Sequence, residues 1–162
     1  MPLKTLVRVL YIDDDPGICR LVQRHLERSG FEVRMAYEAE IGLAMARAEP
    51  FDAIALDHYM PGRDGLDVLA DLRALPEAPP VIFVTAAEEP RIAVAALKAG
   101  AFDYVIKDVQ GTFLEFLSTS LAAVAGAYPA AAGEGGGRAR TAGKPGPAGE
   151  AGPRSRRCCC AR

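Results

Sequence analysis

Apolar runs and helical patterns alternate along most of the chain. Four apolar runs, at residues 6–12, 52–57, 80–85 and 102–106, indicate strands, and the run at 6–12 is nearly continuous, as expected for a strand that helices cover on both faces. A fifth run, at 31–35, alternates apolar with charged residues, which favours a strand at a more exposed edge of the sheet. Because strands that alternate with helices form parallel sheets, the pattern predicts an α/β fold with five parallel strands.

Helical patterns with start and stop signals fill the intervals between these runs. Asp15 and Pro16 fit the cap and the first position of a helix that Gly30 ends. Thr112 and Glu115 have the spacing of a capping box before the last helix. The first predicted helix follows Asp15, the second covers 39–48 and the third contains Leu66 to Leu72. The fourth covers 90–99 and the fifth contains Leu114 to Val124. Residues 58–64 are expected to form a loop.

Five polar residues stand where apolar runs stop: Asp13, Asp14, Asp57, Thr85 and Lys107. The carboxyl ends of parallel strands meet at one edge of an open sheet, and ligands bind there. Three carboxylates crowded at that edge repel one another unless a cation shares the site. The sequence therefore predicts a site for Mg²⁺, with Mn²⁺ as an alternative ion, because both take oxygen ligands.

The same residues offer the groups that phosphoryl transfer needs. The carboxylate of Asp57 can act as a nucleophile. Lys107 supplies a compact positive charge that can pair with Asp57 at rest and with a phosphoryl group later, and Thr85 can donate a hydrogen bond to a phosphoryl oxygen. Since phosphoryl transfer depends mainly on positioning and on neutralising charge, this set of groups is sufficient for it.

Taken in order along the chain, these motifs resemble the receiver domain of two-component response regulators. The similarity covers about residues 5–127. It implies a flavodoxin-like, doubly wound sheet with strand order 2-1-3-4-5 and five helices. The motifs that carry it are Asp13-Asp14, Asp57 followed by Met60-Pro61-Gly62 and Asp64-Gly65, Thr85-Ala86, and Lys107 three residues after Tyr104.

The resemblance also implies roles for single residues. Asp57 would accept phosphate from the phosphohistidine of a histidine kinase or a histidine phosphotransfer protein. Asp14 and Asp57 would bind Mg²⁺ directly, together with the backbone carbonyl of Tyr59, and Asp13 would act largely through water. Such a domain is a signalling phosphoacceptor with self-phosphorylation and self-dephosphorylation chemistry, rather than an enzyme.

Thr85 and Tyr104 would form a switch pair that alters the surface of the fourth helix, fifth strand and fifth helix. This surface would bind partners, and homodimerisation is one use of it. Two phenylalanines of the last helix, Phe113 and Phe116, lie beside its leucine stripe, and both partner contact and core packing remain open for them.

One position departs from the family pattern. Asp108 follows Lys107 where receivers usually have proline, often with a cis bond. A cis bond before a non-proline residue costs about 3–4 kcal/mol, so we expect a trans peptide and an Asp108 carboxylate that faces solvent. His58 directly follows Asp57, but strand alternation turns it away, and we expect a loop histidine.

Two other functions use similar parts. A haloacid-dehalogenase-like, Mg²⁺-dependent phosphatase has its nucleophile in a D-x-D pattern after the first strand, but here Asp13 and Asp15 run straight into Pro16-Gly17. A flavodoxin-like cofactor binder needs backbone donors around the phosphate of its cofactor. An acid pair at that place would repel the phosphate. Both fit the sequence less well than a phosphoacceptor does.

Charge and composition divide the chain near Tyr128. From there on, seven Lys/Arg and two Asp/Glu give +5, so residues 1–127 carry 12 minus 19, or -7. An acidic body argues against specific nucleic-acid binding. The Gly-, Ala-, Pro- and Arg-rich part, 128–162, is expected to be a disordered basic tail, with a linker or a shifted reading frame as alternatives.

No apolar run approaches the length of a membrane span, so a cytoplasmic location is expected. The cysteines Cys158 to Cys160 match neither a disulfide framework nor a zinc site.

Overall fold

The structure is a computed structural model that describes residues 6–86 and 90–127, all of which belong to one compact unit. The expectations for 128–162, including Cys158 to Cys160, lie outside these residues. Within the described part of the chain, no helix is long and apolar enough to cross a membrane.

Five parallel strands form the central sheet in the order β2-β1-β3-β6-β7. This confirms the predicted order 2-1-3-4-5, because β6 and β7 are the fourth and fifth predicted strands. Observed and predicted strands agree to within one residue at either end. Their bounds are Val7–Ile12 (β1), Phe31–Ala36 (β2), Ala53–Asp57 (β3), Val81–Thr85 (β6) and Asp103–Ile106 (β7).

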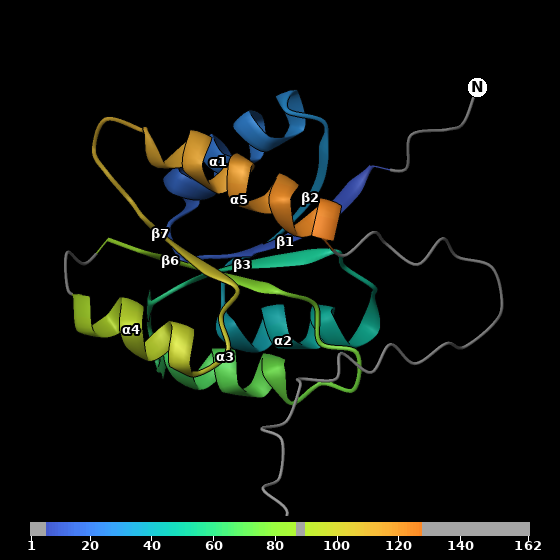
Figure 1. The fold of residues 1–162 in the computed structure, drawn as a ribbon, viewed down its shortest axis with the longest axis vertical. Coiled ribbons are helices and arrows are strands. Elements are labelled where there is room, and N and C mark those ends of the chain that lie inside the picture. Colours follow the sequence, from blue (N-terminus) through green and yellow to red (C-terminus); the bar gives the residue numbers. More distant parts are fainter. Residues whose placement is uncertain (1–5, 87–89, 128–162) are drawn as a thin grey trace, which may run out of the picture. The chain divides into compact units, whose positions relative to one another are not determined.

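Helices cover both faces of the sheet, α1 and α5 on one side and α2, α3 and α4 on the other (Figure 1). Each side has its own core because alternate strand residues point to opposite faces. Tyr11 belongs to the core under α1 and α5, and Ile12 belongs to the other core. The helices are Pro16–Arg28 (α1), Ala39–Ala48 (α2), Gly65–Arg73 (α3), Pro90–Lys98 (α4) and Phe113–Ala127 (α5).

A short antiparallel hairpin, β4 (Tyr59–Met60) and β5 (Arg63–Asp64), occupies the stretch predicted as a loop. Gly62 takes a φ of +82° in its turn, a conformation that glycine adopts easily. Arg63 ties the hairpin to α2 and α3, with hydrogen bonds of 2.9 Å to Glu40 and 2.7 Å to Asp71. The pairing is two residues long, which is too short for a hydrophobic period to predict.

The helix starts agree only in part with the sequence signals. Asp15 caps α1 as predicted, and its side chain accepts hydrogen bonds from the amides of Gly17 and Ile18. At α5, the Glu115 amide bonds to the backbone carbonyl of Thr112, 3.2 Å away, rather than to its hydroxyl as in a capping box. The two phenylalanines of α5 differ: Phe113 is buried in the core, whereas Phe116 is exposed.

Candidate acidic site at the sheet edge

Three aspartates gather at the carboxyl ends of β1 and β3. Each offers one carboxylate oxygen, and these atoms of Asp13, Asp14 and Asp57 all lie within 4.8 Å of one another. The two strands are direct neighbours, with Ile12 paired to Leu56, so the residues that follow them are brought side by side. Asp13 and Asp57 are buried, whereas Asp14 is exposed. The cluster therefore has a closed inner side and one carboxylate open to solvent.

Lys107 reaches this cluster from the end of β7. Its Nζ lies 2.5 Å from Oδ2 of Asp13 and 2.9 Å from Oδ1 of Asp57. Its backbone amide donates to the carbonyl of Thr85, 2.8 Å away, which extends the pairing of β6 with β7 by one step. No peptide bond of the described residues is cis, so the Lys107–Asp108 peptide is trans, as expected.

The ionisation of the cluster follows from burial and from the ion pairs. Burial raises the pKa of Asp57, and the nearby charge of Lys107 opposes this rise. For Lys107, burial lowers the pKa, but the charge of Asp57 and hydrogen bonds to both carboxylates outweigh it, so its pKa is raised and the ammonium stays charged at neutral pH.

The donor set fits a divalent cation. Three carboxylates and one ammonium leave two negative charges without compensation when all are ionised. The oxygens are hard ligands of the kind that Mg²⁺ prefers, and one of the three aspartates is open to solvent, as a partly hydrated ion requires.

Thr85 and Tyr104 lie on neighbouring strands. Thr85 is the buried last residue of β6 and pairs with Ile106 of β7, while Tyr104 pairs with Phe83. Residues two apart on a strand share a face, so Thr85 and Tyr104 lie on the same face of the sheet, the one that α4 covers. Tyr104 is 37% exposed, which leaves its ring at the surface.

The two residues after Asp57 differ in environment. Tyr59, whose carbonyl the resemblance assigns to the cation, is the exposed first residue of β4. His58 lies between strands, as expected, but it is buried against the rings of Tyr59 and Phe83. Its Nδ1 is 3.1 Å from Oδ1 of Asp64, but the contact lacks hydrogen-bond geometry. The two groups are therefore close without forming a hydrogen bond.

Sequence reasoning missed two polar contacts of the site. The Tyr11 hydroxyl donates to Oδ2 of Asp13 across 3.0 Å in the buried core, and burial followed by the charge of Asp13 raises the pKa of this phenol well above its usual value. Asp108 does not simply face solvent: it is half-buried, and its carboxylate accepts the Phe113 amide at 3.0 Å. A polar ring within an apolar strand, two residues before Asp13, was the only signal for Tyr11.

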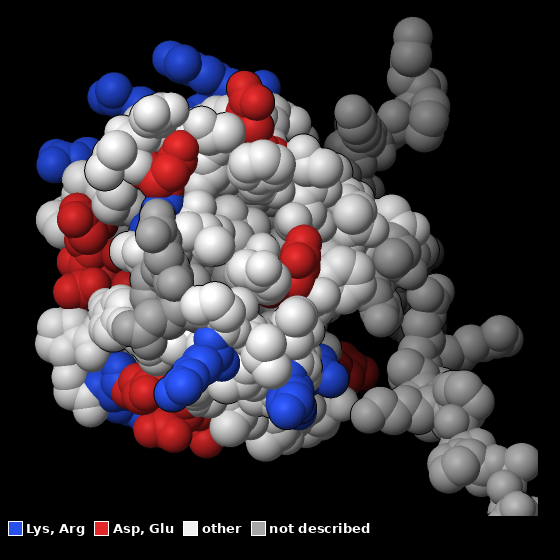
Figure 2. Space-filling view, turned by 60° about the vertical axis from the view of Figure 1, so that its left-hand side comes forward, with Lys and Arg blue, Asp and Glu red and all other residues white. Residues whose placement is uncertain are grey.

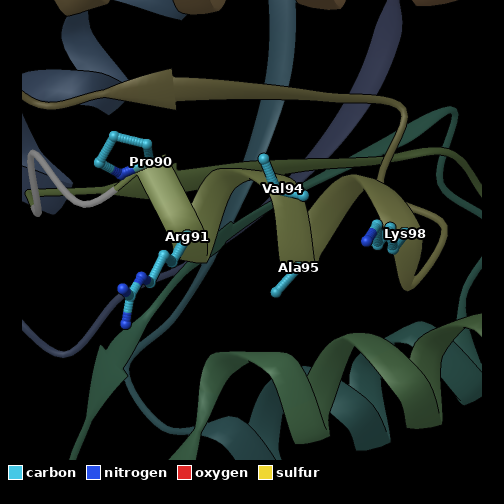
Figure 3. Close-up of a pocket in the computed structure, with 5 residues that line it drawn as sticks. All are labelled: Pro90, Arg91, Val94, Ala95 and Lys98. Carbon is cyan, nitrogen blue, oxygen red and sulfur yellow. The ribbon is translucent and has the colours of Figure 1, made fainter.

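An open pocket away from the cluster lies along α4. Pro90, Arg91, Val94, Ala95 and Lys98 line it, and all five come from that helix (Figure 3). It contains two basic side chains and no carboxylate, so its chemistry is unlike that of the acidic site.

Comparison with known proteins agrees with this geometry. The sequence model of the response regulator receiver domain matches residues 9–115. Transcriptional regulatory protein ZraR of Salmonella typhimurium is 39% identical over 101 residues, which are 62% of this chain and 23% of the relative. Transcriptional regulatory protein PrrA of Mycobacterium tuberculosis is 41% identical over 103 residues, 64% of this chain and 44% of the relative. The chain thus matches less than half the length of these curated relatives.

Solved receiver structures share the fold. A CheY-like receiver domain protein from Methanospirillum hungatei has a TM-score of 0.67 at 31% identity, covering 76% of this chain and 99% of the other. A receiver domain protein from Clostridium thermocellum has a TM-score of 0.68 at 28% identity, covering 75% and 96%. None of these similarities supports the phosphatase alternative. With its acidic cluster and Lys107 inside the matched residues, the chain belongs to the response regulator receiver domain family of two-component signalling.

Proposed function

We propose that Asp57 is the phosphoacceptor of this receiver domain and takes a phosphoryl group from the phosphohistidine of a histidine kinase or a phosphotransfer protein. The observation that carries the proposal is the placement of its buried carboxylate 2.9 Å from the Lys107 ammonium, inside the acidic cluster. A carboxylate oxygen of Asp57 attacks phosphorus while the bond from phosphorus to the histidine nitrogen breaks. The imidazole leaves with that electron pair and is neutral once its ring holds one proton, which water supplies.

Asp13, Asp14 and Asp57, with the backbone carbonyl of Tyr59, would hold Mg²⁺ or Mn²⁺. When bound, the cation neutralises charge on the phosphoryl oxygens. Lys107 provides the second positive charge, since its ammonium can exchange Asp57 for a phosphoryl oxygen. The same groups would allow water to attack the aspartyl phosphate, so the phosphorylated state would decay without a second protein.

Thr85 and Tyr104 would carry the change to a partner surface formed by α4, β7 and α5. The hydroxyl of Thr85 would move toward the phosphoryl group, and the exposed ring of Tyr104 would turn inward on the same sheet face. Exposed apolar residues of these elements support a partner surface, among them Val94, Leu97, Ile106 and Phe116. Figure 2 shows one face on which uncharged surface lies between the charged side chains, with an acidic side chain near the middle and basic side chains below it.

We propose homodimerisation as one use of this surface. We assign no DNA contact to residues 1–127, because their charge of 12 minus 19, or -7, repels phosphates. A filter-binding assay in which residues 1–127 retain DNA would contradict this assignment.

Acetyl phosphate tests the acceptor directly. With Mg²⁺, the chain should gain about 80 Da, the mass of one phosphoryl group, and peptide mapping should place it on Asp57. The Asp57→Asn variant should gain no mass, because an amide oxygen does not attack phosphorus as a carboxylate does. Labelling that is equal in this variant would refute the assignment.

The Lys107→Ala variant tests the part that the lysine plays in phosphoryl transfer. It should still gain the phosphoryl group, more slowly, because the carboxylate nucleophile remains while one positive charge is lost. The same mass measurement, taken as a time course, gives the rate. A rate equal to that of the unmodified chain would contradict the role assigned to Lys107.

A further inference from the structure

Tyr11 places a hydroxyl inside the core beside the acidic cluster. The residue has no exposed surface, and its ring packs in the core under α1 and α5. Its hydroxyl lies 3.0 Å from Oδ2 of Asp13. A buried phenol needs a hydrogen-bond partner, and beside a carboxylate it acts as the donor.

Three donors from three elements converge on the carboxylate of Asp13. Oδ2 accepts from the Tyr11 hydroxyl of β1 and from Nζ of Lys107 beyond β7. Oδ1 accepts from the amide of Asp15 at the start of α1, at 2.9 Å. Since a carboxylate offers roughly four lone-pair positions, these contacts fix its orientation and leave room for one more partner, on Oδ1.

Of the two donors on Oδ2, Tyr11 is the permanent one. In the proposed function, the Lys107 ammonium moves when it exchanges its contact with Asp57 for a phosphoryl oxygen. The Tyr11 ring is locked in a closely packed core, so its hydroxyl stays at Asp13 in either state.

We propose that Tyr11 is a positioning residue of the cation site: its hydroxyl holds the Asp13 carboxylate in the orientation that serves Mg²⁺. The inference rests on the proposed function, because it takes the acidic cluster to be the cation site. It concerns the affinity for the ion, which can be measured without phosphate.

The Tyr11→Phe variant removes only the hydroxyl and keeps the ring in the core. Its dissociation constant for Mg²⁺, followed by NMR shifts of the Asp13 to Asp15 amides, should rise about tenfold, since outer partners of metal ligands typically contribute 10–100-fold. In the Asp13→Ala background, or in Asp13→Asn if the alanine variant fails to fold, the same change should have little further effect.

Ser120→Ala is the matched control. The Ser120 hydroxyl also donates to a carboxylate, that of Asp103 at 2.7 Å, but the pair joins α5 to β7 and contains no residue of the cluster. This variant should bind Mg²⁺ with the affinity of the unmodified chain.

Three results would overturn the inference. Tyr11→Phe could bind Mg²⁺ as tightly as the unmodified chain, it could weaken binding no more than Ser120→Ala does, or its effect could persist in full without Asp13. If the unmodified chain itself binds no Mg²⁺, the proposed cation site is refuted, and the inference with it. That failure appears before any variant is made, so it is distinguishable from the other three.

Discussion

Asp108 holds its carboxylate against the start of α5, directly after the lysine of the site. The Phe113 amide donates to it at 3.0 Å. This hydrogen bond is the largest cause that lowers the pKa of Asp108, and the neighbouring Thr112 lowers it further. The charge of this carboxylate is therefore part of what fixes the loop between β7 and α5.

The sign of its pH dependence follows from that direction. A carboxyl whose pKa is lower in the folded state than its usual 3.8 stabilises the fold above that value, and the contribution is lost as pH falls through the folded-state pKa. The melting temperature of Asp108→Ala should therefore lie below that of the unmodified chain by a constant amount from about pH 7 to 5. The difference should shrink toward about pH 2.

Asp108→Asn provides the control, because its amide oxygen still accepts hydrogen bonds but carries no charge. Its deficit in melting temperature should be smaller than that of the alanine variant. A deficit of Asp108→Ala that stayed unchanged down to pH 2 would contradict a role for the charge.

At the scale of elements, α3 starts in contact with the strand end that carries Asp57, the proposed acceptor. The amide of Gly65, its first residue, donates to the carbonyl of His58 at 2.9 Å. A Cβ at Gly65 would lie 2.6 Å from the carbonyl oxygen of Asp57 and 2.7 Å from Cα of His58. Both are backbone atoms, so no side chain can yield to make room, and only glycine lets α3 begin here.

Gly65→Ala should therefore disturb the site through the backbone. We expect a loss of about 1–3 kcal/mol in the free energy of unfolding, the usual cost of overpacking, and slower labelling at Asp57 because its peptide must shift. Urea denaturation and the acetyl phosphate assay measure the two effects.

The matched control is Gly126→Ala near the end of α5, where an added Cβ meets no atom within 4 Å. Its free energy of unfolding should rise by up to about 1 kcal/mol, because alanine has a higher helix propensity than glycine. Its labelling at Asp57 should be unchanged. Equal stability and equal labelling in Gly65→Ala would show that the close approach is unimportant.

The features that the sequence predicted depend on local patterns along the chain, whereas the features that it missed depend on contacts between distant parts. Helix 39–48 has the observed bounds, and the acids gather as the alternation of strands and helices requires, because strand ends of a parallel sheet share one edge. The contacts of Tyr11 and Asp108 depend on how β1 and α5 are placed in three dimensions, which no local pattern records.

At the scale of the whole molecule, the proposed dimer surface is open to a direct test. After treatment with acetyl phosphate and Mg²⁺, light scattering should give about twice the chain mass of 17.2 kDa. Leu97→Glu on α4 should remain monomeric, because a charge on an apolar interface disfavours association.

Leu21→Glu is the control. Leu21 is 46% exposed, close to the 43% of Leu97, but it lies on α1. It should dimerise like the unmodified chain. We also propose that residues 1–127 are the receiver domain and that 128–162 form a tail that takes no part in association. The same measurement on residues 1–127 tests this proposal. A monomer under all conditions, or a dimer of Leu97→Glu, would refute the assigned surface.

The contact of Lys107 with Asp13 joins residues 94 positions apart, and its contact with Asp57 spans 50. Synthesis runs from the amino end, so a chain still on the ribosome exposes Asp57 well before its counter-charge has emerged. Until β7 takes its place, the acceptor lacks the lysine on which the proposed chemistry depends. In the proposed function, an unfinished chain would therefore accept phosphate more slowly than a complete one.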